Sequence, residues 1–99
     1  AQFQVAIAAV ITLDRKKRCE KASLVLMGVG EMPILGKDST AALIGKQLTD
    51  DVIATAAEIA AQKEADPGED LHATIAYRRH LVNVLVKQAI KTAAQRAEG

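Results

Sequence analysis

The sequence predicts an α+β domain in which a three-stranded antiparallel sheet, a β-hairpin plus an edge strand, is followed by and packed on three α-helices. The first third of the chain alternates like a β-strand, and from Lys37 onward the apolar residues take a helical spacing. Because the strands precede the helices rather than alternating with them, the pattern favours a segregated α+β layer over βαβ units. We expect residues 1–99 to form a single domain.

Three segments near the N-terminus predict the strands. The first, Phe3–Asp14, has two apolar faces. One face carries Val5, Ile7, Ala9, Ile11 and Leu13, and the other carries Ala6, Ala8, Val10 and Thr12. A charged turn, Asp14–Lys17, leads into a second strand over residues 18–29, and Met32–Leu35 reads as a short third strand. Pro33 places the third strand at an edge of the sheet, where a missing N–H is tolerated.

The first helix is predicted to be short. Helical spacing begins at Lys37, and either Asp38 or Ser39 is suited to cap the N-terminus of a helix that continues through Ile44. Gly45 follows as the expected C-terminal stop, because glycine adopts the left-handed conformation that ends many helices.

Two longer helices follow. Thr49 is a good N-cap for the first of them, which we expect to end near Ala65. Its apolar stripe is narrow and consists of Ile53, Ala56, Ala57, Ala60 and Ala61. After a loop at residues 66–70, the final helix is expected from about Thr74 to about Arg96.

Composition limits both the core and the function. Hydrophobic residues make up 49% of the chain, but nineteen of them are alanine, and only Phe3 and Tyr77 are aromatic. The core must therefore be aliphatic, with helices that approach closely. A formal charge of +1, with both signs mixed, argues against a nucleic-acid or acidic-membrane partner. The apolar runs fall short of the roughly 20 residues that span a membrane, no signal peptide is recognised, and the single Cys19 suits a reducing compartment. We expect a cytoplasmic protein.

Apolar residues exceed what so small a domain is expected to cover. Both faces of the first strand are apolar, whereas a sheet that buries one face normally shows polar residues on the other. On the last helix the apolar residues wrap around more than one stripe: Leu81, Val82, Val84, Leu85, Val86 and Ile90. This surplus predicts a docking partner. The alternative is a compact core that uses every side of these elements.

Several residue types that often carry chemistry have simpler explanations here. Gly28-Val29-Gly30 begins like a dinucleotide fingerprint, but Pro33 follows and no helix opens there, so a strand-end turn is favoured. Cys19 has no CxxC partner and reads as a half-buried strand residue. His72 and His80 lack the spacing and the companions of a metal site.

The remaining polar residues do not form a catalytic pattern. Asp50 and Asp51 are better explained as the acidic first turn of a helix than as a carboxylate pair. Neither Ser23 nor Ser39 stands in the glycine elbow that a serine nucleophile requires. We therefore assign no catalytic, cofactor-binding or metal-binding residue in this chain, and expect it not to be catalytic alone.

Arg78-Arg79-His80 is the local charge cluster that carries a functional hypothesis. Two guanidinium groups at the start of a long helix are unfavourable, because cations stabilise the other end. The compensating group is expected to be the Glu69-Asp70 loop, a carboxylate of another domain or a phosphate.

The segment Tyr77–Leu81, followed by an apolar helix that ends in Lys87–Ile90, resembles the last helix of a known domain. That domain is the C-terminal part of the FAD-binding (medium) subunit of molybdenum hydroxylases, the family of carbon monoxide dehydrogenase and xanthine dehydrogenase. Further pieces match in the same order, so the resemblance covers essentially the whole chain: Phe3–Asp14, Gly28–Gly30 with Pro33-Ile34, Gly45-Lys46 with Leu48–Asp50, and Asp66-Pro67.

The chain departs from the family pattern at a few surface and turn positions. Arg15–Lys17 stands where the family usually has a glycine in the first hairpin, Gln2 replaces an acidic residue, and Leu35 replaces an arginine. These positions leave the expected fold unchanged.

The resemblance implies a supporting role in a molybdenum-containing oxidoreductase. FAD would lie in an upstream domain and receive electrons through the [2Fe-2S] clusters of a small subunit from a molybdopterin large subunit. The 99 residues would then be a fragment of a longer FAD-binding subunit, and Arg78 and Arg79 would be structural ion-pair formers. The alternative is a free-standing, non-catalytic interaction module that homo-oligomerises through its apolar sheet face.

Overall fold

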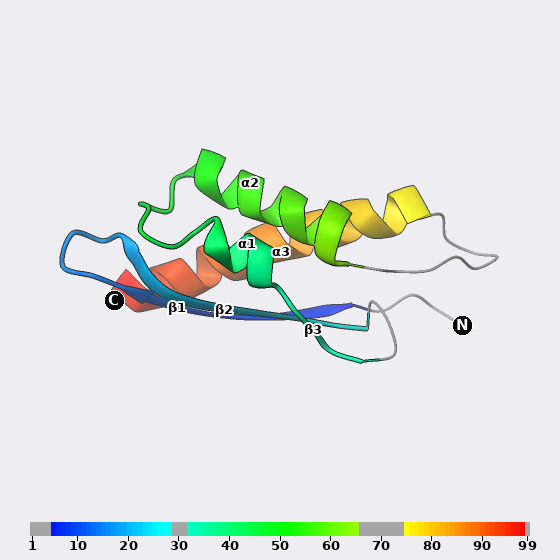
Figure 1. The fold of residues 1–99 in the computed structure, drawn as a ribbon, viewed down its shortest axis with the longest axis horizontal. Coiled ribbons are helices and arrows are strands. Elements are labelled where there is room, and N and C mark those ends of the chain that lie inside the picture. Colours follow the sequence, from blue (N-terminus) through cyan, green and yellow to red (C-terminus); the bar gives the residue numbers. More distant parts are fainter. Residues whose placement is uncertain (1–4, 29–31, 66–74, 99) are drawn as a thin grey trace.

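The computed structural model describes residues 5–28, 32–65 and 75–98. Its elements are β1 (Ala6–Leu13), β2 (Cys19–Met27), β3 (Ile34–Leu35), α1 (Lys37–Ala41), α2 (Asp50–Ile59), the π-helical turn η1 (Ala60–Glu64) and α3 (Ile75–Glu98). Figure 1 shows the strands as one layer with all helices on the same side of it. This arrangement confirms the predicted α+β class, with a three-stranded sheet followed by three α-helices.

The sheet has the strand order β1-β2-β3, and both pairs are antiparallel. Ile7 lies opposite Leu26, and Leu26 lies opposite Ile34, so these side chains share the face that the helices cover. The alternation predicted for the first strand is confirmed, because Ile11 is buried and Val10 is exposed. β3 is an edge strand, as Pro33 predicts, but it is shorter than expected.

The β1–β2 turn is stabilised by Asp14. Its carboxylate accepts hydrogen bonds from the backbone N–H groups of Lys16 (2.8 Å) and Arg18 (2.9 Å). The bond from Arg18, followed by that from Lys16 and the Arg18 guanidinium, holds the pKa of Asp14 below its usual 3.8. Lys17 takes a left-handed conformation, with φ of 63°. This is the hairpin in which the resemblance calls for a glycine, the residue that adopts positive φ without strain.

The prediction for α1 was wrong in its cap and its length. The helix begins after Gly36 and ends at Ala41, and both Asp38 and Ser39 lie inside it. Gly36 is required by close packing, because a Cβ there would stand 2.5 Å from Ser39 Oγ and 3.0 Å from a Leu24 methyl group. The helix begins two or three residues earlier than the capping preference of Asp38 or Ser39 indicates. Gly45 does take the expected left-handed conformation, beyond the end of the helix.

α2 begins as predicted and ends differently. Thr49 is its N-cap, and the Thr49 hydroxyl accepts a hydrogen bond from the Val52 N–H at 3.3 Å. The helical segment reaches the expected end, but its last turn widens into η1, where the Ala65 N–H donates to the Ala60 carbonyl at 2.8 Å. π-Helical turns are rare, and those that exist are mostly single turns inside α-helices, frequently at functional sites.

The core is built from small side chains on α2 and η1 and branched ones on α3. Ala56, Ala57, Ala60 and Ala61 are fully buried, which confirms the predicted stripe with Ile53. They face α3, whose Val82, Val86 and Ile90 are also fully buried and recur every fourth residue. Because alanine projects little, α2 and α3 pack closely. The loop predicted at 66–70 lies outside the described residues.

This close packing predicts that added volume on the alanine stripe is costly. Ala57→Leu should lower the free energy of unfolding by about 1–3 kcal/mol, since no space exists at a fully buried alanine. Ala97→Leu is the matched control, because Ala97 is exposed on α3 and should change stability by less than about 0.5 kcal/mol. Urea denaturation of the three proteins measures both, and equal midpoints would contradict the packing described.

Candidate functional site

Cys19 and the histidines do not form a reactive site. Cys19 is buried rather than half-buried, at 1% exposure, and burial raises the pKa of its thiol. A raised pKa keeps the thiol protonated and unreactive. His80 is exposed on α3, while His72 lies outside the described residues. Across the described ranges, no three His, Cys, Asp or Glu side chains are placed to hold a metal ion.

The other residues that the sequence singled out have structural roles. Gly28 adopts a left-handed conformation just after β2 ends, so the strand-end turn is favoured over a phosphate loop. Asp50 and Asp51 form the acidic first turn of α2, as expected. Ser39 is buried, and its hydroxyl donates to the Gly36 carbonyl at 3.1 Å.

Arg79 is bound by backbone carbonyls. Its Nη1 lies 2.7 Å from the carbonyl oxygen of Ala61, 2.9 Å from that of Gln62 and 3.2 Å from that of Ala65. These carbonyls end η1, where the helix dipole is negative and carbonyl groups lack helical partners. A cation that is unfavourable at the start of α3 is therefore favourable at the end of α2. This partner differs from the carboxylate or phosphate expected from the sequence.

Arg78 and Arg79 differ in burial and lie on different faces of α3. Arg78 is 6% exposed and continues the α3 stripe that carries Val82 and Val86 four and eight residues later. Arg79 is half-buried between α3 and η1. Within the described ranges Arg79 caps backbone carbonyls, and the ion-pair role that the resemblance implied for Arg78 and Arg79 stays a prediction. Glu69 and Asp70 lie outside the described residues.

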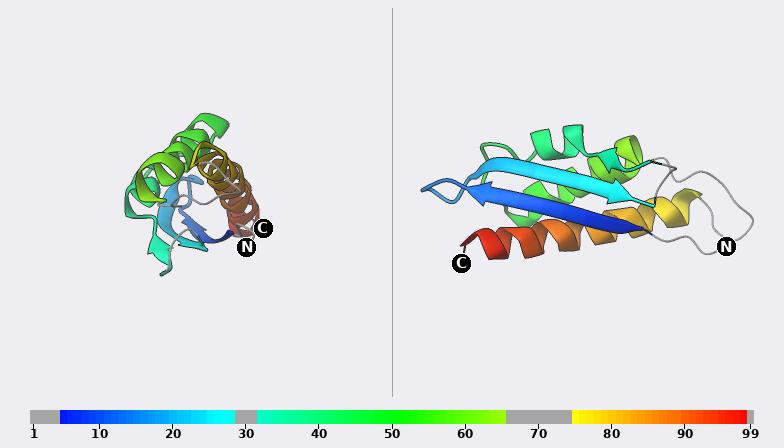
Figure 2. Two further views of the ribbon diagram at one scale, coloured as in Figure 1. Left: turned by 90° about the vertical axis from the view of Figure 1, so that its right-hand side faces the viewer. Right: turned by 90° about the horizontal axis from the view of Figure 1, so that it is seen from below.

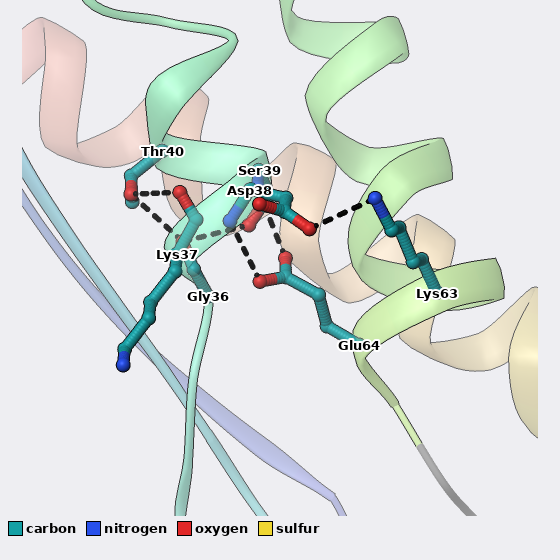
Figure 3. Close-up of polar contacts among 7 residues, drawn as sticks. All are labelled: Gly36, Lys37, Asp38, Ser39, Thr40, Lys63 and Glu64. Atoms are coloured by element: carbon teal, nitrogen blue, oxygen red, sulfur yellow. Dashed lines mark hydrogen bonds and ion pairs between the residues drawn. The ribbon is translucent and has the colours of Figure 1, made fainter.

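Glu64 binds the N-terminus of α1 from the opposite side of the same turn. Its two carboxylate oxygens accept hydrogen bonds from the backbone N–H groups of Asp38 (2.9 Å) and Ser39 (3.1 Å), as Figure 3 shows. The Lys63 ammonium also meets the Asp38 carboxylate at 3.0 Å. Glu64 therefore supplies the cap that no side chain near Gly36 provides. Sequence reasoning missed it, because about 25 residues separate Glu64 from the helix it caps.

The outer face of the sheet carries exposed apolar side chains. Rows across the strands pair Ala6 with Met27, and Ala8 with Val25 and then Leu35. Val10 is 66% exposed and Leu35 59% exposed on this face. Toward the hairpin turn the same face becomes polar, with Ser23, Thr12 and Lys21. The right-hand view of Figure 2 looks onto this side, where no helix covers the strands.

The fold and this surface define a class: a small α+β domain with helices on one face of an antiparallel sheet and an open apolar face on the other. The family described as the CO dehydrogenase flavoprotein C-terminal domain matches residues 3–93. The chain belongs to this family, which confirms the resemblance to the C-terminal domain of the FAD-binding subunit of molybdenum hydroxylases.

Individual relatives support the same family assignment. The 6-hydroxypseudooxynicotine dehydrogenase complex subunit alpha of Paenarthrobacter nicotinovorans is 30% identical over 90 residues, which are 91% of this chain and 30% of the relative. Quinoline 2-oxidoreductase from Pseudomonas putida 86 is 30% identical, with a TM-score of 0.85, over 94% of this chain and 32% of that chain.

Carbon monoxide dehydrogenase from Hydrogenophaga pseudoflava is 25% identical, with a TM-score of 0.84, over 93% of this chain and 31% of that chain. This chain therefore spans about a third of the length of these relatives. In the part of the chain that the structure describes, no helix is both long and apolar enough to cross a membrane.

The contacts of Arg79 predict a clear effect of its removal. Arg79→Gln should lower the free energy of unfolding by about 1.5–3 kcal/mol, because charged hydrogen bonds to three carbonyls at the end of η1 are lost. Arg96→Gln is the control on the same helix. Arg96 makes no hydrogen bond or ion pair within the described ranges, so only its interaction with the helix dipole, about 0.3–1 kcal/mol, is at risk. Equal losses in denaturant titrations would refute the capping role.

Glu64 predicts a second, local effect. Glu64→Gln replaces one accepting oxygen with an NH₂ group that faces a backbone N–H, so the cap on α1 is broken and stability should fall by about 1–2 kcal/mol. Amide exchange of Asp38 and Ser39 should accelerate, while exchange of the α3 core amides changes only with global stability. Glu20→Gln, at an exposed position on β2, is the control and should leave those two amides unchanged.

Proposed function

We propose that this domain is the C-terminal part of a cytoplasmic FAD-binding subunit in a molybdenum hydroxylase-type oxidoreductase, where it supports the flavin module structurally. The observation that carries the proposal is the family match over residues 3–93, together with a chain that spans only about a third of its relatives. In this role the domain packs against the FAD-binding part of the subunit. That part receives electrons from the [2Fe-2S] clusters of a small subunit, which in turn receives them from a molybdopterin large subunit.

The described glycines do not form a site for FAD. Binding of a dinucleotide pyrophosphate requires a glycine turn that opens a helix with free N–H groups. Gly28 follows β2, and Gly45 stands four residues before α2 begins. Gly36 does open α1, but the N–H groups of Asp38 and Ser39 there already bind the Glu64 carboxylate, which would repel a phosphate. We therefore assign FAD to the remainder of the subunit and derive no chemical step in this domain.

The names of the relatives support a role that is independent of substrate. Quinoline, carbon monoxide and 6-hydroxypseudooxynicotine differ greatly in size and polarity, yet the relatives named for them share this domain at 25–30% identity. A domain common to such different enzymes is suited to holding the subunit together rather than to selecting a substrate. The apolar outer face of the sheet is the surface suited to that packing, because covering it removes exposed apolar side chains from water.

A second function is favoured by the same face. A free-standing interaction module would cover its outer sheet face with a second copy, without any flavoprotein. Sedimentation velocity of the 99-residue chain separates the two functions. A stable dimer that is disrupted by Val10→Lys supports the second, and a monomer supports the first.

The proposed packing predicts selective effects of charges on the outer face. In the complete flavoprotein subunit, Val10→Lys should lower the temperature at which FAD is released, because a lysine is then buried against the neighbouring part. A loss of about 1–2 kcal/mol corresponds to a shift of several degrees. In the isolated chain, where Val10 is exposed, the same change should alter stability by less than about 0.5 kcal/mol.

Ala41→Lys is the matched control for this experiment, since Ala41 is exposed on α1 in the helical layer. It should leave flavin release unchanged in the subunit. The isolated chain mixed with FAD should emerge from gel filtration without flavin. Yellow protein, or equal effects of Val10→Lys and Ala41→Lys, would contradict the proposed function.

A further inference from the structure

The two edges of the sheet differ in how they are protected against further pairing. β3 is two residues long and is preceded by Pro33, features that natural edge strands use to prevent pairing. β1 is eight residues long and contains neither a charge nor a proline. Its one irregularity, a register shift between Thr12 and Leu13, lies at the hairpin end. Within the described ranges no strand pairs with the outer side of β1.

An unprotected edge strand presents hydrogen-bonding groups. In an antiparallel pair, alternate residues of the outer strand direct both their N–H and C=O groups away from the partner. β1 therefore has a row of outward backbone donors and acceptors over its apolar length. Such a row is a template for another strand, and in native proteins it is normally covered.

A groove runs along this edge. It has a volume of about 490 Å³ and lies between residues 5–9 and one stripe of α3. The stripe follows the three- and four-residue spacing of one helix face and consists of Leu85, Gln88, Ala89, Thr92, Ala93 and Arg96. Figure 2 shows α3 beside β1 at this side of the sheet, running in the same direction. The helical layer thus continues past the last strand of the sheet.

We propose that an extended segment from the remaining part of the flavoprotein pairs with the outer edge of β1 as a fourth strand and lies in this groove against α3. The proposal rests on the proposed function and adds the edge of β1, beside the outer sheet face, as a second surface by which the two parts are joined. A strand is the element that matches the edge, because its own N–H and C=O groups complete the hydrogen bonds that a helix or loop leaves open. About two thirds of each relative lies outside the region matched here, so such a segment is available.

The side chains of the groove specify the chemistry of that segment. Ala6, Ala8 and Ala9 leave room for a close neighbour, so small apolar residues fit beside them. Arg96 is exposed at the groove and makes no ion pair within the described ranges, which favours a carboxylate at one end of the segment. Among the described residues that line the groove there is no Asp or Glu, so the lining of a second copy offers Arg96 no carboxylate.

Hydrogen exchange of the β1 amides tests the proposal. In the isolated 99-residue chain, alternate amides between Ile7 and Ile11 should exchange quickly, since half of them point outward. In the complete flavoprotein subunit these same amides should exchange at least about 100-fold more slowly, because they are then bonded to the added strand. NMR resolves the amides in the chain, and mass spectrometry with electron-transfer fragmentation resolves them in the subunit.

Two variants with the same change in charge sharpen the test. In the subunit, Arg96→Gln should reduce the protection of the outward β1 amides about tenfold, as expected from the loss of one charged contact. Gln95→Glu, at an exposed position next to it on α3 but outside the groove, should leave the protection unchanged.

Three outcomes decide whether a fourth strand pairs with β1. Slow exchange in the subunit and fast exchange in a monomeric chain support the fourth strand. Fast exchange in both, with Val10→Lys still lowering the temperature of flavin release, overturns the fourth strand and leaves the proposed function standing. Protection in the isolated chain that rises with concentration and accompanies a dimer overturns it in favour of a second copy.

Discussion

The widened turn that ends α2 is the constraint on which the arrangement of the helices depends. On one side, the Glu64 carboxylate holds the N-terminus of α1, and on the other the Arg79 guanidinium holds the carbonyls of Ala61, Gln62 and Ala65. One helical turn therefore fixes the positions of both neighbouring helices. An ordinary α-helical end leaves four carbonyls to be satisfied, and here a cation from the next helix meets several of them. The Arg79 charge is unfavourable at the start of α3, but it stabilises the carbonyl end of the preceding helix.

The same region explains why so few large side chains are sufficient for a core. Ala56, Ala57, Ala60 and Ala61 bring α2 and η1 close to α3, where Val82, Val86 and Ile90 fill the space between the helices and the sheet. Close approach in turn places Arg79 within reach of η1. The alanine packing and the Arg79 hydrogen bonds therefore support each other, because both need a short distance between η1 and α3.

All helices lie on one face of the sheet, and this asymmetry leaves the domain open in two directions. The outer sheet face presents Val10, Met27 and Leu35 to solvent, and the free edge of β1 adjoins a groove along α3. A self-contained domain of this size normally shows polar residues on such a face. The chain belongs to the family of CO dehydrogenase flavoprotein C-terminal domains and spans about a third of the length of its named relatives. The neighbours that we propose for the two surfaces would come from the remaining part of such a protein.

Local pattern was enough to predict the class of fold, the strand faces, the N-cap at Thr49 and the alanine stripe, because each depends on residues within one or two turns of one another. The position of the third strand at an edge of the sheet was predicted from Pro33, which is also a local signal. The cap of α1, the partner of Arg79 and the widening of α2 were decided only by tertiary structure. Glu64 and Arg79 act across some 14 to 26 residues, and no short-range preference of either residue indicates which helix end it will meet. The groove beside β1 likewise depends on how α3 lies against the strand edge. The residue pattern along either element does not indicate this arrangement.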